Sequence, residues 1–389
     1  MTQTMLSADQ VKPGAQAVLS RADFDHLITV LQAEGYDVIG PTVDNGAVVY
    51  QEIDNAGALP EGVASRQAAG RYRLEKRADN ALFGYIAGAQ SWRPYLFQPS
   101  RTVWRAEKSG DELSFTEPEE PAPKMAFLGM RACELAAIEL QDRVFMNGDA
   151  PDPDYAARRS GALFIAVNCG EAGETCFCVS MDTGPKVTRG HDLVLTELIA
   201  PDAHDFLVEI ETEAGAEIAR KLPLRAAEPQ EVGRADAILA ETAQSMGRAL
   251  DTNGLKEILQ DNQDAPQWGD VAERCLSCAN CTLVCPTCFC NTTEDVTALD
   301  GESAERRQRW ASCFNLDFSY LHGGPVRPSV EARYRQWMTH KLAHWIDQFG
   351  DSGCVGCGRC ISWCPASIDI TEEAAALRRH AEEADNGEN

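Results

Sequence analysis

The first quarter of the chain carries apolar residues at two kinds of spacing, one typical of helices and one typical of strands. Apolar residues from Phe24 to Leu31 recur at the spacing of one helix face, and Gly35 follows as a helix stop. Alternating apolar and polar residues predict strands further on. The predicted elements are a loose arm at 1–20, a helix followed by a strand within 21–43, strands at 47–53 and 72–76, and an aromatic loop at 91–100.

A second pattern of strand, helix and strand begins after residue 124. Residues 125–130 and 162–169 are short apolar runs that predict buried strands, and residues 132–145 between them predict a helix. Two strands that flank one helix indicate a parallel βαβ unit. Residues 192–198 and 205–210 add further strand pattern.

The pattern becomes helical from about residue 230, and we place a domain boundary near 230–255. Helices are predicted at 234–250, 268–285 and 331–349, and Gly350 closes the last of them. One face of that last helix carries Tyr334, Trp337, Met338, Leu342, Trp345 and Phe349. The acidic residues 382–389 predict a solvated tail.

Composition limits the classes of function. The chain has 389 residues, enough for two or three domains, and its net charge of -25 disfavours binding to nucleic acid or to an anionic membrane surface. The first twenty residues lack the pattern of a signal peptide, and no apolar stretch approaches the ~18 residues of a membrane helix. We therefore expect a soluble, cytoplasmic protein without membrane insertion. In that reducing compartment, fifteen cysteines indicate metal binding or redox chemistry rather than structural disulfides.

Eight of the cysteines form one motif that occurs twice. The spacing C-x2-C-x2-C-x3-C-P begins at Cys275 and again at Cys354. In this spacing three cysteines hold three corners of one [4Fe–4S] cubane, and the fourth cysteine supplies the last corner of the other cubane. The predicted ligands are Cys275, Cys278, Cys281 and Cys364 for cluster one, and Cys354, Cys357, Cys360 and Cys285 for cluster two.

Zinc and disulfides are weaker explanations of this motif. Structural zinc usually takes two separated pairs of ligands, which a repeated run of four cysteines with a trailing proline does not resemble. Small ferredoxins place their two motifs close together, whereas about seventy residues with a helical pattern intervene here. The predicted fold class is α+β or α/β, with an N-terminal and central α/β domain at 1–240. An α-helical, ferredoxin-like domain with two clusters follows at 241–389.

Four further cysteines indicate a third cluster in the α/β part. Cys133 lies where a helix begins, and Cys169 ends a strand at the edge of the sheet where sites usually lie. Cys176 and Cys178 return the chain to that edge, so the four cysteines together predict a third [4Fe–4S] site. Buried free thiols are the alternative. Arg131, beside Cys133, either balances the charge of such a cluster or pairs with a carboxylate.

The other candidate residues give no complete site. Cys288, Cys290 and Cys313 are one short of a ligand set, and three roles stay open: thiols near a cluster, ligands with a non-cysteine fourth partner, or inert core residues. Of these roles, a fourth cluster is less favoured. His340 and His344 lie four apart, but ordinary helix histidines explain them better than a metal pair. No G-x-G-x-x-G follows a strand and no Ser/His/Asp set is present, so we predict no catalytic residues and no bound nicotinamide.

Longer stretches of the sequence resemble a known family. "CLSCANCTLVCPTCFC", "SCFNLDFSYLHGG", "RYRQWMTHKLAHWIDQFG" and "SGCVGCGRCISWCPASIDIT" resemble the β (iron–sulfur) subunit of cytosolic NiFe sulfhydrogenases, which are NAD(P)-linked hydrogenases. "GMRACELAAIELQDRVF" and "NCGEAGETCFCVSMDTGP" match the central domain of the same family, and the electron-input subunit of anaerobic sulfite reductase is a close relative. The resemblance covers roughly residues 80–375.

The resemblance implies a heteromeric complex. NiFe hydrogenase small and large subunits would carry the NiFe site, and a γ subunit would bind FAD and NAD(P). This chain would relay electrons between them and would not itself be catalytic. The alternative is the electron-input subunit of an anaerobic sulfite reductase-type complex. A self-contained enzyme with flavin in the α/β domain and a zinc-bound interaction module are two further alternatives.

Overall fold

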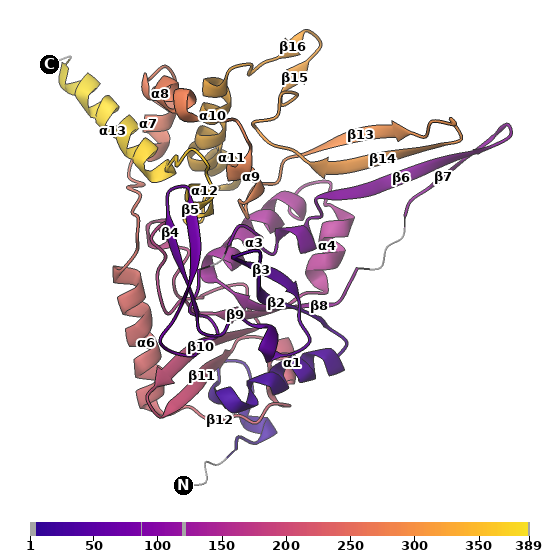
Figure 1. The fold of residues 1–389 in the computed structure, drawn as a ribbon. Coiled ribbons are helices and arrows are strands. Elements are labelled where there is room, and N and C mark those ends of the chain that lie inside the picture. Colours follow the sequence, from indigo (N-terminus) through magenta and orange to yellow (C-terminus); the bar gives the residue numbers. More distant parts are fainter. Residues whose placement is uncertain (1–4, 87, 119–121, 388–389) are drawn as a thin grey trace.

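The centre of the molecule is a mixed sheet of eight strands in the order β12-β1-β11-β10-β9-β8-β2-β3 (Figure 1). The structure is a computed structural model that describes residues 5–86, 88–118 and 122–387. The four middle strands β10, β9, β8 and β2 run parallel, and antiparallel strands flank them on both sides. The strands of this sheet are β1 (Gln16–Ser20), β2 (Asp37–Asp44), β3 (Ala47–Glu52), β8 (Met125–Met130), β9 (Leu163–Val167), β10 (Leu193–Ala200), β11 (Ala203–Ile210) and β12 (Arg225–Ala226).

Helices cover both faces of the sheet, because the side chains of its parallel strands alternate between two apolar cores. In β8, Ala126 and Leu128 pack in a core with α1 and α5, whereas Phe127 and Met130 pack in a second core with α3 and α4. Burial on both faces explains why this strand is a continuous apolar run. A further helix, α6, packs on β10 and β11. The bounds are α1 (Phe24–Ala33), α3 (Ala132–Phe145), α4 (Pro153–Ser160), α5 (Glu213–Ala219) and α6 (Pro229–Gln244).

The predicted α/β fold class is confirmed, and so is the parallel βαβ unit formed by β8, α3 and β9. The prediction of a loose arm over residues 1–20 is wrong for its last part. Residues 16–20 form β1, which pairs with β11 on one side and β12 on the other and buries Ala17, Val18 and Leu19. The predicted aromatic loop contains one helical turn, α2 (Arg93–Leu96).

The C-terminal part is mainly helical, as predicted, and packs around its own apolar core. The helix predicted at 331–349 is confirmed as one continuous helix in which a π-helical turn, His340–His344, joins α10 and α11. The helix predicted at 268–285 is wrong beyond Arg274, where the chain becomes irregular before the next helical turn. The bounds are α7 (Leu255–Asp261), α8 (Gln267–Arg274), α9 (Asn280–Leu283), α10 (Val330–Thr339), α11 (Trp345–Phe349), α12 (Arg359–Ser362) and α13 (Ile370–Gly387).

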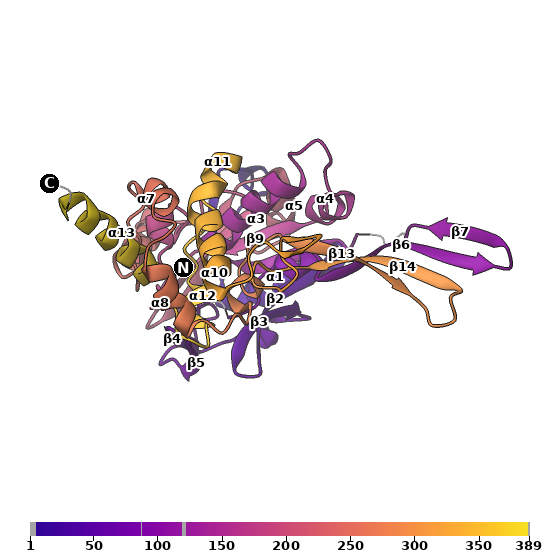
Figure 2. The same ribbon diagram turned by 90° about the horizontal axis from the view of Figure 1, so that it is seen from above.

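A protruding four-stranded sheet joins the two halves of the sequence, and the hydrophobic pattern did not predict it. Its order is β13-β14-β6-β7, so a hairpin from the cysteine-rich half pairs with a hairpin from the α/β half (Figure 2). Its strands are mostly polar and exposed, which removes the alternation that reveals a half-buried strand. The bounds are β6 (Ser100–Ser109), β7 (Glu112–Thr116), β13 (Asn291–Thr297) and β14 (Ser303–Trp310).

Two small hairpins complete the fold. The hairpin of β4 (Val63–Ala68) and β5 (Arg71–Lys76) lies against the cysteine-rich part, where Tyr72 stacks on Trp363 with 5.2 Å between ring centroids. The second hairpin is formed by β15 (Tyr320–Leu321) and β16 (Gly324–Pro325). Short 3-10 helices occur at Ala8–Gln10, Arg21–Asp23, Ala56–Ala58 and Cys178–Met181. In the part of the chain that the structure describes, no helix has both the length and the apolar character needed to cross a bilayer.

Candidate metal centres

The two cysteine motifs fold alike, as an irregular turn followed by one turn of helix. Ser277 and Ala279 of the first motif have φ of 50° and 66°, and Gly356 and Gly358 have φ of 63° and 72° at the matching positions of the second motif. Each pair precedes a four-residue helix, α9 or α12, and the two helices pack on each other. Residues in the left-handed region bend the backbone sharply, which lets cysteines two residues apart face a common space.

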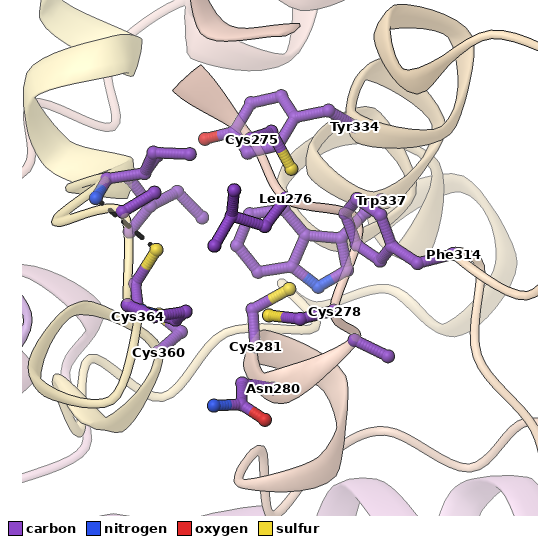
Figure 3. A pocket seen from close by; sticks show the side chains of 15 residues that line it. Cys275, Leu276, Cys278, Asn280, Cys281, Phe314, Tyr334, Trp337, Cys360 and Cys364 are labelled. Atoms are coloured by element: carbon purple, nitrogen blue, oxygen red, sulfur yellow. Dashed lines mark hydrogen bonds between the residues drawn. The ribbon is translucent and has the colours of Figure 1, made fainter. Parts of the chain in front are cut away.

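The cysteines predicted for cluster one line a single pocket, called here the Cys275 site (Figure 3). Its members are Cys275, Cys278, Cys281 and Cys364. Much of the remaining wall is apolar, including Phe314 and Trp337. The backbone N–H groups of Ser277 and Ile368 lie 3.4 Å from the sulfurs of Cys275 and Cys364, respectively. Such N–H donors stabilise negative charge on cluster sulfurs, so this pocket fits a thiolate-held cluster.

The cysteines predicted for cluster two are also close neighbours, and they are called here the Cys354 site. Its members are Cys354, Cys357, Cys360 and Cys285. Burial, and then the nearby sulfurs of the other three members, raise the pKa of Cys360 well above its ordinary value. The N–H of Gly356 lies 3.5 Å from the Cys354 sulfur, and Lys341 Nζ lies 3.2 Å from the Cys285 sulfur. These four cysteines would hold iron as thiolates, and the positive charge of that iron would offset the cost of crowding their sulfurs together.

The four cysteines predicted for a third cluster line one pocket as well, called here the Cys133 site. Its members are Cys133, Cys169, Cys176 and Cys178. The start of α3, the end of β9 and the following loop bring them together. Burial, and then the neighbouring sulfur of Cys169, raise the pKa of Cys176 to about 12. A Cβ on Gly184 would lie 3.1 Å from the Cys178 sulfur, so glycine leaves the room that this pocket requires.

Two buried arginines, Arg131 and Arg359, line the Cys133 site. The Arg131 guanidinium donates to the carbonyl oxygens of Phe83, Tyr85 and Asn168, so it brings its charge to the pocket without a carboxylate hydrogen bond. Arg359 is paired with Glu134, at 2.6 Å. Both cations favour negative charge in the pocket, as a cluster with four thiolates would carry.

The three cysteines whose role the sequence left open lie together, in what is called here the Cys288 site. Cys288, Cys290 and Cys313 line one pocket with His340 and Lys341, whereas His344 does not line it. A hydrogen bond from Cys313, which outweighs burial, lowers the pKa of Cys290 to about 7. Burial lowers the pKa of His340 to about 4. Only His340 of the two histidines lines this pocket, which agrees with the prediction that His340 and His344 are not a metal pair.

The pockets adjoin one another through shared cysteines. Cys357 belongs to the Cys354 site and also lines the Cys133 pocket, and Cys360 of the same site lines the Cys275 pocket. The Cys354 site therefore lies between the other two. Cys278 is exposed, which brings the Cys275 site to the molecular surface. Among the described residues, no three His, Cys, Asp or Glu side chains converge on the position of a single metal ion.

Comparison with known proteins identifies the class of the cysteine-rich part. Residues 274–368 match the family model of the 4Fe-4S dicluster domain, which contains both cysteine motifs. The chain is thus an iron–sulfur protein with a domain for two [4Fe–4S] clusters. No solved structure matches it.

The comparison with curated proteins is more specific. The chain is 31% identical over 303 residues to sulfhydrogenase 2 subunit beta of Pyrococcus furiosus, a match that covers 77% of this chain and 86% of the relative. The chain belongs to the family of sulfhydrogenase beta subunits.

Proposed function

We propose that this chain is an electron relay with three [4Fe–4S] clusters, held at the Cys275, Cys354 and Cys133 sites. The first two use the ligands that the doubled motif predicts, and the third uses Cys133, Cys169, Cys176 and Cys178. The α/β domain at 1–240 would contain the Cys133 site, and the helical domain at 241–389 would contain the other two.

The adjacency of the three sites is the observation that carries this proposal. Cys357 and Cys360 each line the pocket of a neighbouring site, so the Cys354 site contacts both others. Each cluster, when bound, accepts and releases one electron. A row of such sites carries electrons one at a time between two partner sites, one of them a flavin that exchanges electrons with a nicotinamide in pairs.

The chain's own groups favour the reduced, more negative state of each cluster. Backbone N–H groups donate to sulfurs of the two helical sites, and Lys341 donates to Cys285. Arg131 and Arg359 bring positive charge to the Cys133 pocket. Hydrogen bonds to sulfur and local charge both set cluster potentials, so these groups raise the reduction potentials of the sites that they face.

The partners follow from the family. We propose that NiFe hydrogenase small and large subunits bind at one end of the relay and an FAD/NAD(P)-binding subunit binds at the other. The alternative partner is the siroheme subunit of an anaerobic sulfite reductase-type complex. Co-purification with a tagged full-length chain from its native cells distinguishes the two, because nickel with FAD marks the first and siroheme marks the second.

Iron and acid-labile sulfide, measured on the anaerobically purified chain, test the relay itself. The three sites predict at least about twelve irons and as many sulfides per chain. Replacing Cys169 and Cys176 with serine should remove about four irons and leave the signals of the other clusters in the EPR spectrum of the dithionite-reduced protein. Zinc without sulfide would refute the relay, and iron unchanged in this variant would refute the Cys133 site alone.

A further inference from the structure

The Cys288 site is fixed from several sides, although neither cysteine motif includes it. Gln141 donates from α3 to the Cys288 carbonyl at 3.3 Å. Arg93 donates to the same carbonyl at 3.0 Å and to the Cys285 carbonyl at 2.7 Å. The N–H of Ala311 donates to the Cys290 carbonyl at 2.8 Å, which ties the loop to the segment that carries Cys313. Three thiols from two separate segments are thus held around one pocket.

Two buried cations favour an anionic occupant of this pocket: Lys341 lines it, and Arg93, outside the lining, donates to the Cys288 carbonyl. Arg93 is 3% exposed and Lys341 is 5% exposed, and among the described residues neither forms an ion pair with a carboxylate. The Arg93 guanidinium lies 3.5 Å from the ring centroid of Trp310. A buried cation without a counter-charge is costly. Lys341 has its partner in Cys285, but Arg93 reaches only backbone carbonyls and the ring.

We propose that Cys288, Cys290 and Cys313 hold a fourth iron–sulfur cluster, with an imidazole nitrogen of His340 as its fourth ligand. Three thiolates leave one corner of a cubane open, and a neutral imidazole is a known replacement for thiolate at iron in such clusters. His340 lines the same pocket, and its ring is held there between Phe289 and Trp345 with centroid distances of 6.0 Å and 6.2 Å. A thiolate-held cluster supplies the negative charge that Arg93 lacks.

A fourth cluster would add a side branch to the proposed relay of three clusters. The Cys288 site adjoins the Cys354 site, because Lys341 lines the Cys288 pocket and also donates to the sulfur of Cys285 at 3.2 Å. An electron on the Cys354 site would then have three neighbouring positions. The competing explanation is a dithiol pair, since Cys290 and Cys313 share a hydrogen bond and could instead oxidise to a disulfide.

Metal content and pulsed EPR on the anaerobic full-length chain test the fourth cluster. The wild type should contain about sixteen irons, and the C288S/C290S variant should lose about a quarter of them while it keeps the other cluster signals. His340→Ala should abolish a nitrogen coupling seen in the reduced wild type. His344→Ala, four residues further along the same helix and outside the pocket, should keep that coupling.

The outcomes separate this inference from the relay. About twelve irons in the wild type, with no histidine coupling, would overturn the fourth cluster and leave the relay intact. A Cys290–Cys313 disulfide found by mass spectrometry in the air-free protein would overturn it as well. If C288S/C290S fails to fold, His340→Cys decides, because the proposal requires that this variant keep all its iron and lose only the nitrogen coupling.

Discussion

The buried ion pair between Glu134 and Arg359 ties the α/β part to the cysteine-rich part, and its removal gives the sharpest test of that contact. Glu134 lies on α3 and Arg359 on α12, with 2.6 Å between their charged groups and side-chain exposures of 0% and 3%. Glu134 also accepts from the Tyr50 hydroxyl at 2.7 Å and from the N–H of Arg131 at 3.0 Å. Burial is the largest influence on the pKa of Arg359 and lowers it, but Glu134 together with the neighbouring Cys357 and Cys133 raises that pKa above its ordinary value.

The size of the loss in stability depends on which member of the ion pair is left in place. Glu134→Gln keeps an oxygen for Tyr50 but leaves Arg359 buried and unpaired, which costs about 3–5 kcal/mol in the free energy of unfolding. Replacing Glu134 with Leu and Arg359 with Met leaves no unpaired buried charge. Only the groups that formed hydrogen bonds with the two side chains lose a partner. Those are the Tyr50 hydroxyl and the Arg131 N–H, which donate to Glu134, and the Gly88 carbonyl, which accepts from Arg359 at 3.0 Å. Each unsatisfied group costs about 1–3 kcal/mol. The loss in the free energy of unfolding should therefore be smaller in the double variant than the sum of the losses in the two single variants.

Urea unfolding of the anaerobic protein, followed by far-UV circular dichroism, measures this cycle, with iron content checked for each variant. The exposed pair Arg66–Glu75, with side-chain exposures of 63% and 53%, supplies the control. Glu75→Gln should cost far less than Glu134→Gln, because solvent screens an exposed pair. If Glu134→Gln is no more damaging than Glu75→Gln, the pair is not desolvated and the reasoning fails.

Three further changes test other parts of the structure. In an EPR-monitored redox titration, Lys341→Met should lower the reduction potential of the Cys354 site by at least about 60 mV, which is a tenfold change in the equilibrium constant for one electron. Lys341→Arg keeps the positive charge and should leave most of this potential unchanged. Arg225 holds the pKa of Glu231 below its ordinary value of 4.5. The stability that this ion pair gives to the folded state is present above about pH 4.5 and is lost as the pH falls through the lower pKa of Glu231 in the folded protein. Glu231→Gln should therefore make the free energy of unfolding depend less on pH in the acid range. Gly356→Ala should destabilise far more than Gly254→Ala, because both have similar positive φ but only at Gly356 would a Cβ lie 2.6 Å from another backbone atom.

The sequence predicted those features that depend on local spacing. The apolar runs at 125–130 and 162–169 gave strands of the parallel sheet because burial on both faces removes polar positions. The cysteine spacing grouped eight thiols that the structure also brings together. Four further thiols lie together at the end of β9, as predicted from the rule that sites in parallel sheets lie at the carboxyl ends of the strands.

Features that depend on long-range pairing were not predicted. The strand at 16–20 was missed because Ala17, Val18 and Leu19 are all buried, which removes the alternation, and its partners β11 and β12 lie far along the chain. The four-stranded sheet was missed because exposed strands need no apolar alternation. The role of Cys288, Cys290 and Cys313 stayed open in the sequence because β13 and β14 intervene, and the pairing of these strands brings Cys290 back to Ala311 beside Cys313.

The net charge of the sequence gave no indication of the buried cations that lie beside the cysteines. The chain carries -25 overall, yet four cations are buried beside its cysteines: Arg93, Arg131, Lys341 and Arg359. Of these, Arg359 pairs with a carboxylate, and the others donate to backbone carbonyls, a hydroxyl or a thiol. Acidic groups on the surface are screened by salt within about 8–10 Å, whereas buried charges are screened much less. The local field at the Cys133, Cys354 and Cys288 sites is therefore dominated by these cations, so reduced clusters bound there would be stabilised despite the acidity of the whole chain.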